Sequence, residues 1–270
     1  MIQRIKPNNK IFNSKEFQKD KYKFFLILQN LDSKELELCS DEKNYILCRG
    51  GKKWPTWIWT KDKLDTSLIK EIEEAINLYR LDFDTRFTCK KELYNLLVKD
   101  NFENLGNYYF EMGYLTCKKT IKPKEVDGYI QLATPEDEGL LSEFIYNESR
   151  EITDIKDLSM DEAKDRFKDR LKLGTYYVWK NSKDNIVAQA FYKVLDNNAK
   201  ISGVYTLPEK RGKGYAANII YVLTNKMLQE GKHVSLYTDY SYIPSNKAYK
   251  NVGYKEEDIL INFSCTKIDK

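Results

Sequence analysis

The sequence predicts an α/β protein of the α+β type, with a mixed, mainly antiparallel sheet that helices flank. Two patterns predict this fold. Three strand-like segments follow one another with only short polar turns between them, as consecutive antiparallel strands do. The third of these strands leads through a glycine-containing turn into a long helix, after which another strand begins. The hydrophobic fraction of 41% and the charged fraction of 32% are typical of a chain that buries a core.

The helices of the second half are recognised by their ends. Residues 134–137 (Thr-Pro-Glu-Asp) supply an N-cap, a proline and two acids for a helix that continues to about Asn147. Ser159 and Glu162 form a capping box that opens a second helix, which Gly174 ends. A third helix is expected from Tyr215 to Glu230 and a short fourth one behind Pro244. Strands are expected at 129–133, 175–180, 185–195, 200–207, 234–239 and 259–264.

The first half of the chain also mixes strands and helices. The polar segment 122–128 contains a proline and a glycine and is a candidate linker, so two domains are expected, residues 1–124 and 125–270. Both halves contain Y-x-x-x-G-Y, at 109–114 and 249–254, which predicts a short helical stretch ended by glycine. The repeat could reflect a duplication of the two halves, but a common helix C-cap would give the same pattern. The first half is expected to have strands at 24–29, 45–49 and 56–60 and helices at 66–79 and 90–98.

Several functional classes are disfavoured by composition. The net charge of +4 is small, and basic residues are interspersed with acidic ones, so nucleic-acid binding is not expected. Five cysteines without C-x-x-C spacing are expected to be free thiols, without a metal site. The first residues lack the apolar core of a signal peptide, and the apolar run 24–31 is too short to cross a bilayer, so a cytoplasmic protein with no membrane partner is expected. The single histidine, His233, is expected to be structural.

The segment 201–216, ISGVYTLPEKRGKGYA, carries the clearest functional signal. Successive N–H groups at a helix N-terminus attract anionic oxygens, and glycines at 212 and 214 let the backbone approach a ligand closely. Arg211 and Lys213 add positive charge, so the loop suits a pyrophosphate. A Rossmann turn is rejected because a proline and charges separate the glycines from their strand, and a Walker A loop lacks its Gly-Lys-Ser/Thr. A ligand-free strand-to-helix turn is the alternative.

Residues 211–216 (RGKGYA) match the R/Q-x-x-G-x-G/A signature of the GNAT superfamily of acetyl-CoA-dependent N-acetyltransferases, which the region 129–264 resembles. The downstream S-N-K-A-Y-x-x-x-G-Y strengthens the resemblance, whereas the first half is similar only to the degenerate half of tandem GNAT proteins. The resemblance implies acetyl-CoA (coenzyme A) as cofactor. It places Val204, Tyr205 and Thr206 beside the pantetheine arm. It further implies that Arg211 helps to bind the cofactor and that Asn246 contacts it. The pyrophosphate would be held by Gly212, Lys213, Gly214, Tyr215, Ala216 and Ala217.

The chemistry that the resemblance implies needs no histidine. A main-chain N–H on a strand that Gly203 lets splay would stabilise the oxyanion, and Tyr249 would protonate the departing thiolate. Tyr249 can equally be one of 20 tyrosines that pack a core. The family often has an asparagine seven residues before this tyrosine, where this chain has Tyr242, and a glutamate on the strand before the loop, which is absent here. The base stays unassigned among Asp239, Glu148, Glu151 and a water chain.

The expected activity is transfer of an acetyl group to a primary amine, on a small molecule or a peptide, with a homodimer left open. The principal alternative is a non-catalytic acyl-CoA-binding regulatory or scaffold protein, which the missing base favours. An aminoacyl transferase that acts on a charged RNA is disfavoured by the scattered basic residues. A nucleotide-dependent oxidoreductase is disfavoured by the strand order.

Overall fold

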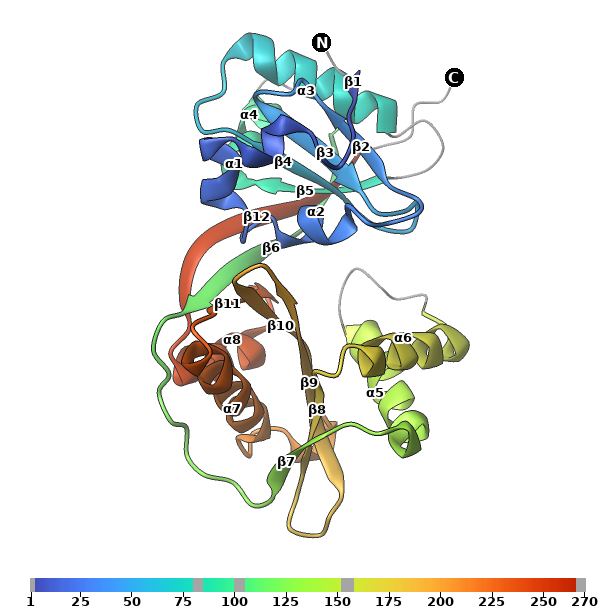
Figure 1. The fold of residues 1–270 in the computed structure, drawn as a ribbon, viewed down its shortest axis with the longest axis vertical. Helices are drawn as coiled ribbons and strands as arrows, with labels where there is room; N and C mark the ends of the chain where they lie inside the picture. The colour runs from blue at the N-terminus through green and yellow to red at the C-terminus, as the bar shows by residue number, and fades with distance from the viewer. Residues whose placement is uncertain (1–2, 80–84, 100–104, 152–157, 266–270) are drawn as a thin grey trace. The chain divides into compact units, whose positions relative to one another are not determined.

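A computed structural model describes residues 3–79, 85–99, 105–151 and 158–265 (Figure 1). The chain forms two compact units. Unit 1 comprises residues 1–114, 239–241 and 258–270, and unit 2 comprises residues 115–238 and 242–257. In the described part of the chain, none of the helices is both long enough and apolar enough to span a membrane.

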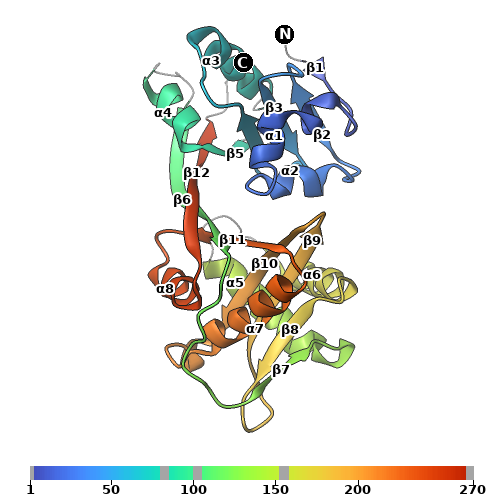
Figure 2. The same cartoon turned by 60° about the vertical axis from the view of Figure 1, so that its left-hand side comes forward.

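Unit 2 is a sheet with helices on both faces. Its strands are ordered β11-β10-β9-β8-β7; β7 to β10 are antiparallel and β10 pairs with β11 in parallel. Helices α5 and α6 cover one face, and α7 and α8 contribute to the core on the other (Figures 1 and 2). The strands are β7 (Tyr129–Leu132), β8 (Tyr176–Lys180), β9 (Ile186–Leu195), β10 (Asn198–Thr206) and β11 (His233–Asp239), and the helices are α5 (Glu138–Glu151), α6 (Met160–Lys172), α7 (Tyr215–Gln229) and α8 (Ile243–Val252).

The elements predicted for this half are confirmed, because their signals are local. Ser159 accepts the N–H of Glu162, whose carboxylate accepts the N–H of Ser159, so the expected capping box opens α6. Thr134 and Asp137 form the same reciprocal arrangement ahead of α5, at the 3-10 turn η2 (Pro135–Asp137). Gly174 has a φ of +64°, the left-handed conformation that ends a helix.

The strands of unit 1 are ordered β1-β2-β3-β4-β5-β12-β6. Helices α3 and α4 pack on one face of these strands, and the rings of Phe17 and Phe24 contact Trp59 and Trp57 from the other side. Its elements are β1 (Gln3–Arg4), η1 (Lys10–Asn13), α1 (Lys15–Asp20), α2 (Phe25–Asn30), β2 (Glu37–Ser40), β3 (Tyr45–Arg49), β4 (Thr56–Thr60), α3 (Thr66–Tyr79), β5 (Thr85–Lys90), α4 (Lys91–Lys99), β6 (Leu105–Cys117) and β12 (Lys255–Cys265).

Two predictions for the first half are wrong. The run 24–29 is not a strand: residues 25–30 form helix α2, because a short apolar run fits a buried helix as well as a buried strand. The stretch 109–114 is not helical either but lies within the long strand β6. Gly253 is a left-handed C-cap with a φ of +104°, whereas Gly113 sits inside a strand, so the Y-x-x-x-G-Y repeat does not mark equivalent structures.

The compact units do not follow the expected domain boundary at 124/125. The predicted linker 122–128 is irregular chain inside unit 2, and the chain passes from unit 1 to unit 2 between Tyr114 and Leu115. The last strand, β12, then returns to unit 1 and pairs with β5. Whether residues 1–124 and 125–270 are separate functional domains stays a prediction.

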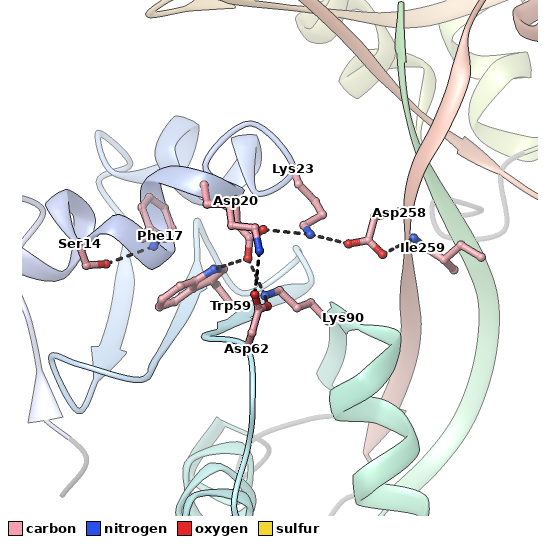
Figure 3. A network of polar contacts seen from close by, with 10 residues as sticks. Ser14, Phe17, Asp20, Lys23, Trp59, Asp62, Lys90, Asp258 and Ile259 are labelled. Atoms are coloured by element: carbon pink, nitrogen blue, oxygen red, sulfur yellow. Dashed lines mark hydrogen bonds and ion pairs between the residues drawn. The ribbon is translucent and has the colours of Figure 1, made fainter.

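A network of buried charges links the elements of unit 1 (Figure 3). Asp20 accepts a hydrogen bond from the indole Nε1 of Trp59 at 3.0 Å and pairs with Lys90 at 2.6 Å and Lys23 at 3.0 Å. Lys23 also pairs with Asp258 of β12 at 2.5 Å. Burial alone would raise the pKa of Asp20, but Lys90 and Lys23 outweigh it and hold the pKa below 3.8. The network therefore depends on an ionised Asp20.

Replacing Asp20 by asparagine is expected to destabilise unit 1 by roughly 3–5 kcal/mol, because the buried Lys90 would lose its nearest carboxylate and keep only the exposed Asp62. The measurement is tryptophan fluorescence during urea unfolding, because Trp59 donates a hydrogen bond to Asp20. The exposed pair of Lys19 with Asp62 is the control, since solvent screens this pair and Lys19→Ala should leave the unfolding midpoint almost unchanged. Because folding lowers the pKa of Asp20, stability should also fall as pH drops below about 4. Equal effects of both variants would contradict a structural role for the buried pair.

Candidate functional site

Strands β10 and β11 separate at their carboxyl ends. Their parallel register runs from Asn198 opposite His233 to Ile201 opposite Leu236. Beyond that pair, β10 continues to Thr206 and β11 to Asp239 without pairing with each other. The register between β10 and β9 shifts between Ser202 and Tyr205. Such a bulge re-aims a strand and leaves main-chain N–H and C=O groups without ladder partners. The strand that precedes the glycine loop therefore offers an edge at which an extended ligand can pair.

Gly203 makes this bulge. Its φ is +61°, and a Cβ placed on it would lie 2.5 Å from the ring of Phe191 and 3.1 Å from Nη1 of Arg170. A side chain at 203 would therefore be excluded both by the backbone conformation and by these neighbours. The sequence prediction that Gly203 lets this strand bulge is supported by both observations.

The loop after β10 ends in two left-handed glycines. After the 3-10 turn η3 (Pro208–Lys210), Gly212 has a φ of +74°, and Gly214, the N-cap of α7, has a φ of +100°. A Cβ on Gly212 would meet no atom of the described residues within 4 Å, so among these residues this side of the loop is open. The first N–H groups of α7 have no helical acceptors, and Gly214 has no side chain to cap them. An anion at this helix end would satisfy those donors.

Tyr215 fixes the first turn of α7 to the preceding irregular segment. Its hydroxyl donates to Oδ1 of Asp127 at 2.5 Å, and Oδ2 of Asp127 accepts from both N and Oγ of Ser182. These donors, Tyr215 first, lower the pKa of Asp127 to about 2. The side chain of Tyr215 thus has a structural role, and only its main-chain N–H remains available to a ligand at the loop.

The Arg211 side chain is directed back toward the protein. Nε donates to the main-chain oxygen of Thr206 at 3.0 Å, Nη2 pairs with Glu151 at 2.7 Å, and the guanidinium lies 5.4 Å from the ring centre of Tyr205. These contacts hold the loop against the end of β10. Arg211 therefore shapes the loop, whereas Lys213 is exposed beside the open glycines.

Tyr249 on α8 lies in the core cluster that also contains Ile201, Leu236 and Ala217, next to the point where β10 and β11 separate. Its side chain is only 7% exposed, and its ring contacts Tyr254 edge to face. Within the described residues, its hydroxyl makes no hydrogen bond. Burial, and then the charge of Glu148, raise the pKa of Tyr249 well above 10, so the phenol stays protonated at neutral pH. The protonated hydroxyl is therefore available as a hydrogen-bond donor.

Asn246 precedes Tyr249 by one turn of α8 and is also buried. Its Oδ1 accepts from Thr238 Oγ1 at 2.7 Å, which fixes the start of α8 to the end of β11. Asn246 thus lies where the two strands separate. Its predicted contact with a cofactor remains a prediction.

The candidate bases have different environments. Glu148 on α5 is largely buried and accepts from Nη1 of Arg170 at 3.1 Å and from Nε2 of Gln189 at 3.2 Å. Glu151 is engaged by Arg211, and Oδ1 of Asp239 accepts from N and Oγ of Ser241. Of the three, only Glu148 is a charge that acts on the pKa of Tyr249.

His233 is also placed by a structural contact. Its Nδ1 lies 2.7 Å from Oδ1 of Asn198, which joins the first residues of β11 and β10 at the end of the sheet opposite the glycine loop. Burial is the main cause of its lowered pKa. This position agrees with the predicted structural role.

Most predicted site residues are brought together at one end of the unit 2 sheet. The stretch 204–217 follows the freed end of β10, the loop and the first turn of α7, and α8 adds Asn246 and Tyr249. A polar group formed by Arg170, Glu148 and Gln189 also belongs to this region, with Arg170 beside Gly203. Of its three members, sequence analysis identified only Glu148 as a candidate. No local motif marks the group, because its members come from α6, α5 and β9.

Residues 142–254 match the model of the acetyltransferase (GNAT) family. A GNAT-family acetyltransferase from Colwellia psychrerythraea has a similar structure, with 11% identity and a TM-score of 0.63 over 98% of this chain and 100% of that chain. A GCN5-related N-acetyltransferase from Sphaerobacter thermophilus has 11% identity and a TM-score of 0.68 over 100% and 97% of the two chains. Another, from Kribbella flavida, has 14% identity and a TM-score of 0.57 over 82% and 86%. No curated protein matches the chain significantly. The likeness to the first two structures is one of fold and includes the N-terminal unit.

Proposed function

Because residues 142–254 match the model of the acetyltransferase (GNAT) family, we propose that the chain transfers an acetyl group from acetyl-CoA to a primary amine. The observation that carries the proposal is the combination of the separated strands β10 and β11 with the open glycine loop that follows β10. An extended ligand with a pyrophosphate at one end would fit both features at once.

The residues present suit the cofactor. Main-chain groups of Val204, Tyr205 and Thr206 would pair with the amides of the pantetheine arm, as an added strand pairs with a sheet edge. The pyrophosphate would lie on the N–H groups of residues 212–217, where the open side of Gly212 leaves space. Lys213 would add charge from the exposed side of the loop. Asn246 would contact the cofactor from α8.

The chain's own groups can assist each step of acetyl transfer. When bound, acetyl-CoA supplies a thioester whose carbonyl carbon the neutral amine attacks. A main-chain N–H freed at the β10 bulge would donate to the developing oxyanion. The phenol of Tyr249 would donate its proton to the leaving sulfur as the C–S bond breaks. Since burial raises the pKa of Tyr249, a lasting phenolate is unfavourable there, so its proton must be returned promptly from the amine or from solvent.

The experiment is a coenzyme A release assay with acetyl-CoA and a panel of primary amines, with mass spectrometry of the products. Release that requires an amine and yields its N-acetyl derivative is the expected result. Binding of acetyl-CoA without amine-dependent release would instead support the acyl-CoA-binding regulatory or scaffold protein. Thermal stabilisation by NADH but not by acetyl-CoA would overturn both proposals. The quaternary state, a monomer or a homodimer, can be measured on the same samples by light scattering.

A further inference from the structure

A buried polar network lies on the α5/α6 side of the unit 2 sheet, beside the bulge of β10. Its four side chains come from four elements: Tyr176 from β8, Gln189 from β9, Glu148 from α5 and Arg170 from α6. The hydroxyl of Tyr176 donates to Oε1 of Gln189, whose Nε2 donates to Oε2 of Glu148 at 3.2 Å. The same carboxylate oxygen accepts from Nη1 of Arg170 at 3.1 Å. The contacts therefore connect the sheet to both helices.

Each member of the network has a defined orientation. Burial raises the pKa of Tyr176, so its hydroxyl stays protonated and donates. This donor determines which end of the Gln189 amide is the oxygen, and the amide nitrogen is thereby directed at Glu148. Among the described residues, no polar side-chain atom of the network is buried without a hydrogen-bond partner. A buried network whose members are all satisfied is rigid.

The network contacts the two residues of β9 that flank the bulge. Phe191 lies opposite Ser202, the last paired residue of β10 before the irregularity. Gln189 lies opposite Tyr205, the first paired residue after it. Gln189 is itself a member of the network, and the guanidinium of Arg170 lies 4.7 Å from the ring centre of Phe191. Both ends of the bulge are therefore held from the side of α5 and α6.

The bulged backbone packs directly against the network. A Cβ on Gly203 would lie 2.5 Å from the ring of Phe191 and 3.1 Å from Nη1 of Arg170. This nitrogen is also the atom that pairs with Glu148. Because the ring and the guanidinium leave no space beside Gly203, a shift of either group would change the direction of the main-chain N–H groups at the bulge.

The ion pair in this network is not explained by stability. The side chains of Arg170 and Glu148 are only 13% and 12% exposed, on helices whose inward residues Phe144 and Phe167 form an apolar cluster. Replacing a buried ion pair by apolar residues of similar size often leaves a protein equally stable or more stable. A directed network can instead hold a backbone segment in one geometry.

We propose that Gln189, Arg170 and Glu148 are positioning residues, which hold the β10 bulge so that its main-chain N–H points at the thioester oxygen. The inference rests on the proposed function, because it concerns the oxyanion donor of that same site. A misplacement of about 1 Å can lower a rate by roughly 10²-fold. The glycine loop, which Tyr215 and Asp127 hold independently, would still bind the cofactor. Loss of the network should therefore lower kcat and change KM for acetyl-CoA little.

Gln189→Met is the test variant. It keeps an unbranched side chain of similar length, removes both hydrogen bonds of the amide and leaves Glu148 paired with Arg170. We expect kcat to fall at least tenfold and KM for acetyl-CoA to stay within threefold of the wild-type value. Variants of Glu148 are avoided because it is also a candidate base, and loss of either charge would leave the other buried and unpaired.

Asn198→Leu is the matched control. Asn198 and Gln189 are both fully buried carboxamides, and Oδ1 of Asn198 also takes part in two side-chain hydrogen bonds, with His233 and Ser235. Asn198 lies at the opposite end of β10 from the bulge. Its loss should lower the melting temperature about as much as Gln189→Met, whereas kcat should stay within threefold of wild type. Equal falls in kcat for the two variants would indicate a general loss of structure and overturn the inference.

Amide hydrogen exchange, measured by NMR without ligand, separates this inference from the proposed function. The reporter is the N–H of Leu207, which donates to the main-chain oxygen of Val187 at 3.1 Å just beyond the bulge. Its exchange should be at least tenfold faster in Gln189→Met and within twofold of wild type in Asn198→Leu. That result, with no amine acetylated by wild type, would retain the hold on the bulge and overturn only the proposed function. Wild-type exchange at Leu207 in Gln189→Met, or a kcat within threefold of an active wild type, would overturn the inference.

Discussion

Tyr249→Phe is expected to lower turnover by about 10²–10⁴-fold while the affinity for acetyl-CoA changes little. The variant removes the proposed proton donor and retains the ring, which packs in the core and contacts Tyr254. Since the hydroxyl makes no hydrogen bond within the described residues, its loss should leave the melting temperature almost unchanged. Turnover with the best acceptor, acetyl-CoA affinity by calorimetry and the melting temperature are measured on one preparation.

Tyr254→Phe is the matched control. Tyr254 is equally buried, and its hydroxyl is hydrogen-bonded to Thr224 at 2.7 Å. Its removal should cost about 1 kcal/mol of stability and leave turnover within a few-fold. The two variants thus have opposite signatures. Turnover of Tyr249→Phe at the wild-type level would remove this tyrosine from the mechanism and favour the acyl-CoA-binding alternative.

Gly214→Val is expected to weaken acetyl-CoA binding at least tenfold, which is about 1.4 kcal/mol. The backbone at 214 has a φ of +100°, which disfavours a branched residue, and a Cβ there would lie 3.2 Å from Cγ1 of Val126. The substitution therefore distorts the N-terminus of α7 and the donors that it presents. Calorimetric titration with acetyl-CoA is the measurement.

Two further glycine variants separate binding from folding. Gly212→Ala adds only a methyl group, on the open side of the loop, and should also weaken binding through its φ of +74°. Gly231 ends the same helix with a φ of +71° and has nothing within 4 Å of its Cβ position. Gly231→Ala should therefore lower the free energy of unfolding about as much as Gly212→Ala, without changing the affinity for acetyl-CoA. Affinities at the wild-type level for both loop variants would contradict the assignment of 212–217 to the pyrophosphate.

Sequence reasoning succeeded where the structure is determined by neighbours in the chain. The caps at Thr134 and Ser159, the stop at Gly174 and the strand-loop-helix order around 212–214 all depend on residues within one or two turns. The helix at 25–30 and the strand through Gly113 could not be predicted, because each is decided by the surface against which it packs. In α2, for example, Ile27 lies over β3, where its carbonyl accepts from Sγ of Cys48.

The same distinction applies to the site. The signature residues of the glycine loop are contiguous, so their pattern was visible. The direction of the Arg211 side chain was not, because its partner Glu151 is 60 residues away. Arg170, Glu148 and Gln189 come from two helices and one strand, and in the sequence they look like ordinary polar residues.

The return of β12 to unit 1 has a consequence for the order in which the protein can fold during synthesis. In unit 1, β12 lies between β5 and β6, and its Asn262 accepts a hydrogen bond from Thr88 that spans 174 residues of sequence. The N-terminal part emerges first from the ribosome but lacks an internal strand of its sheet until residues 258–265 have been made. The sheet of this N-terminal part therefore has an open edge while unit 2 is translated. A translation pause just before residues 258–265 should therefore favour aggregation more than a pause just after them.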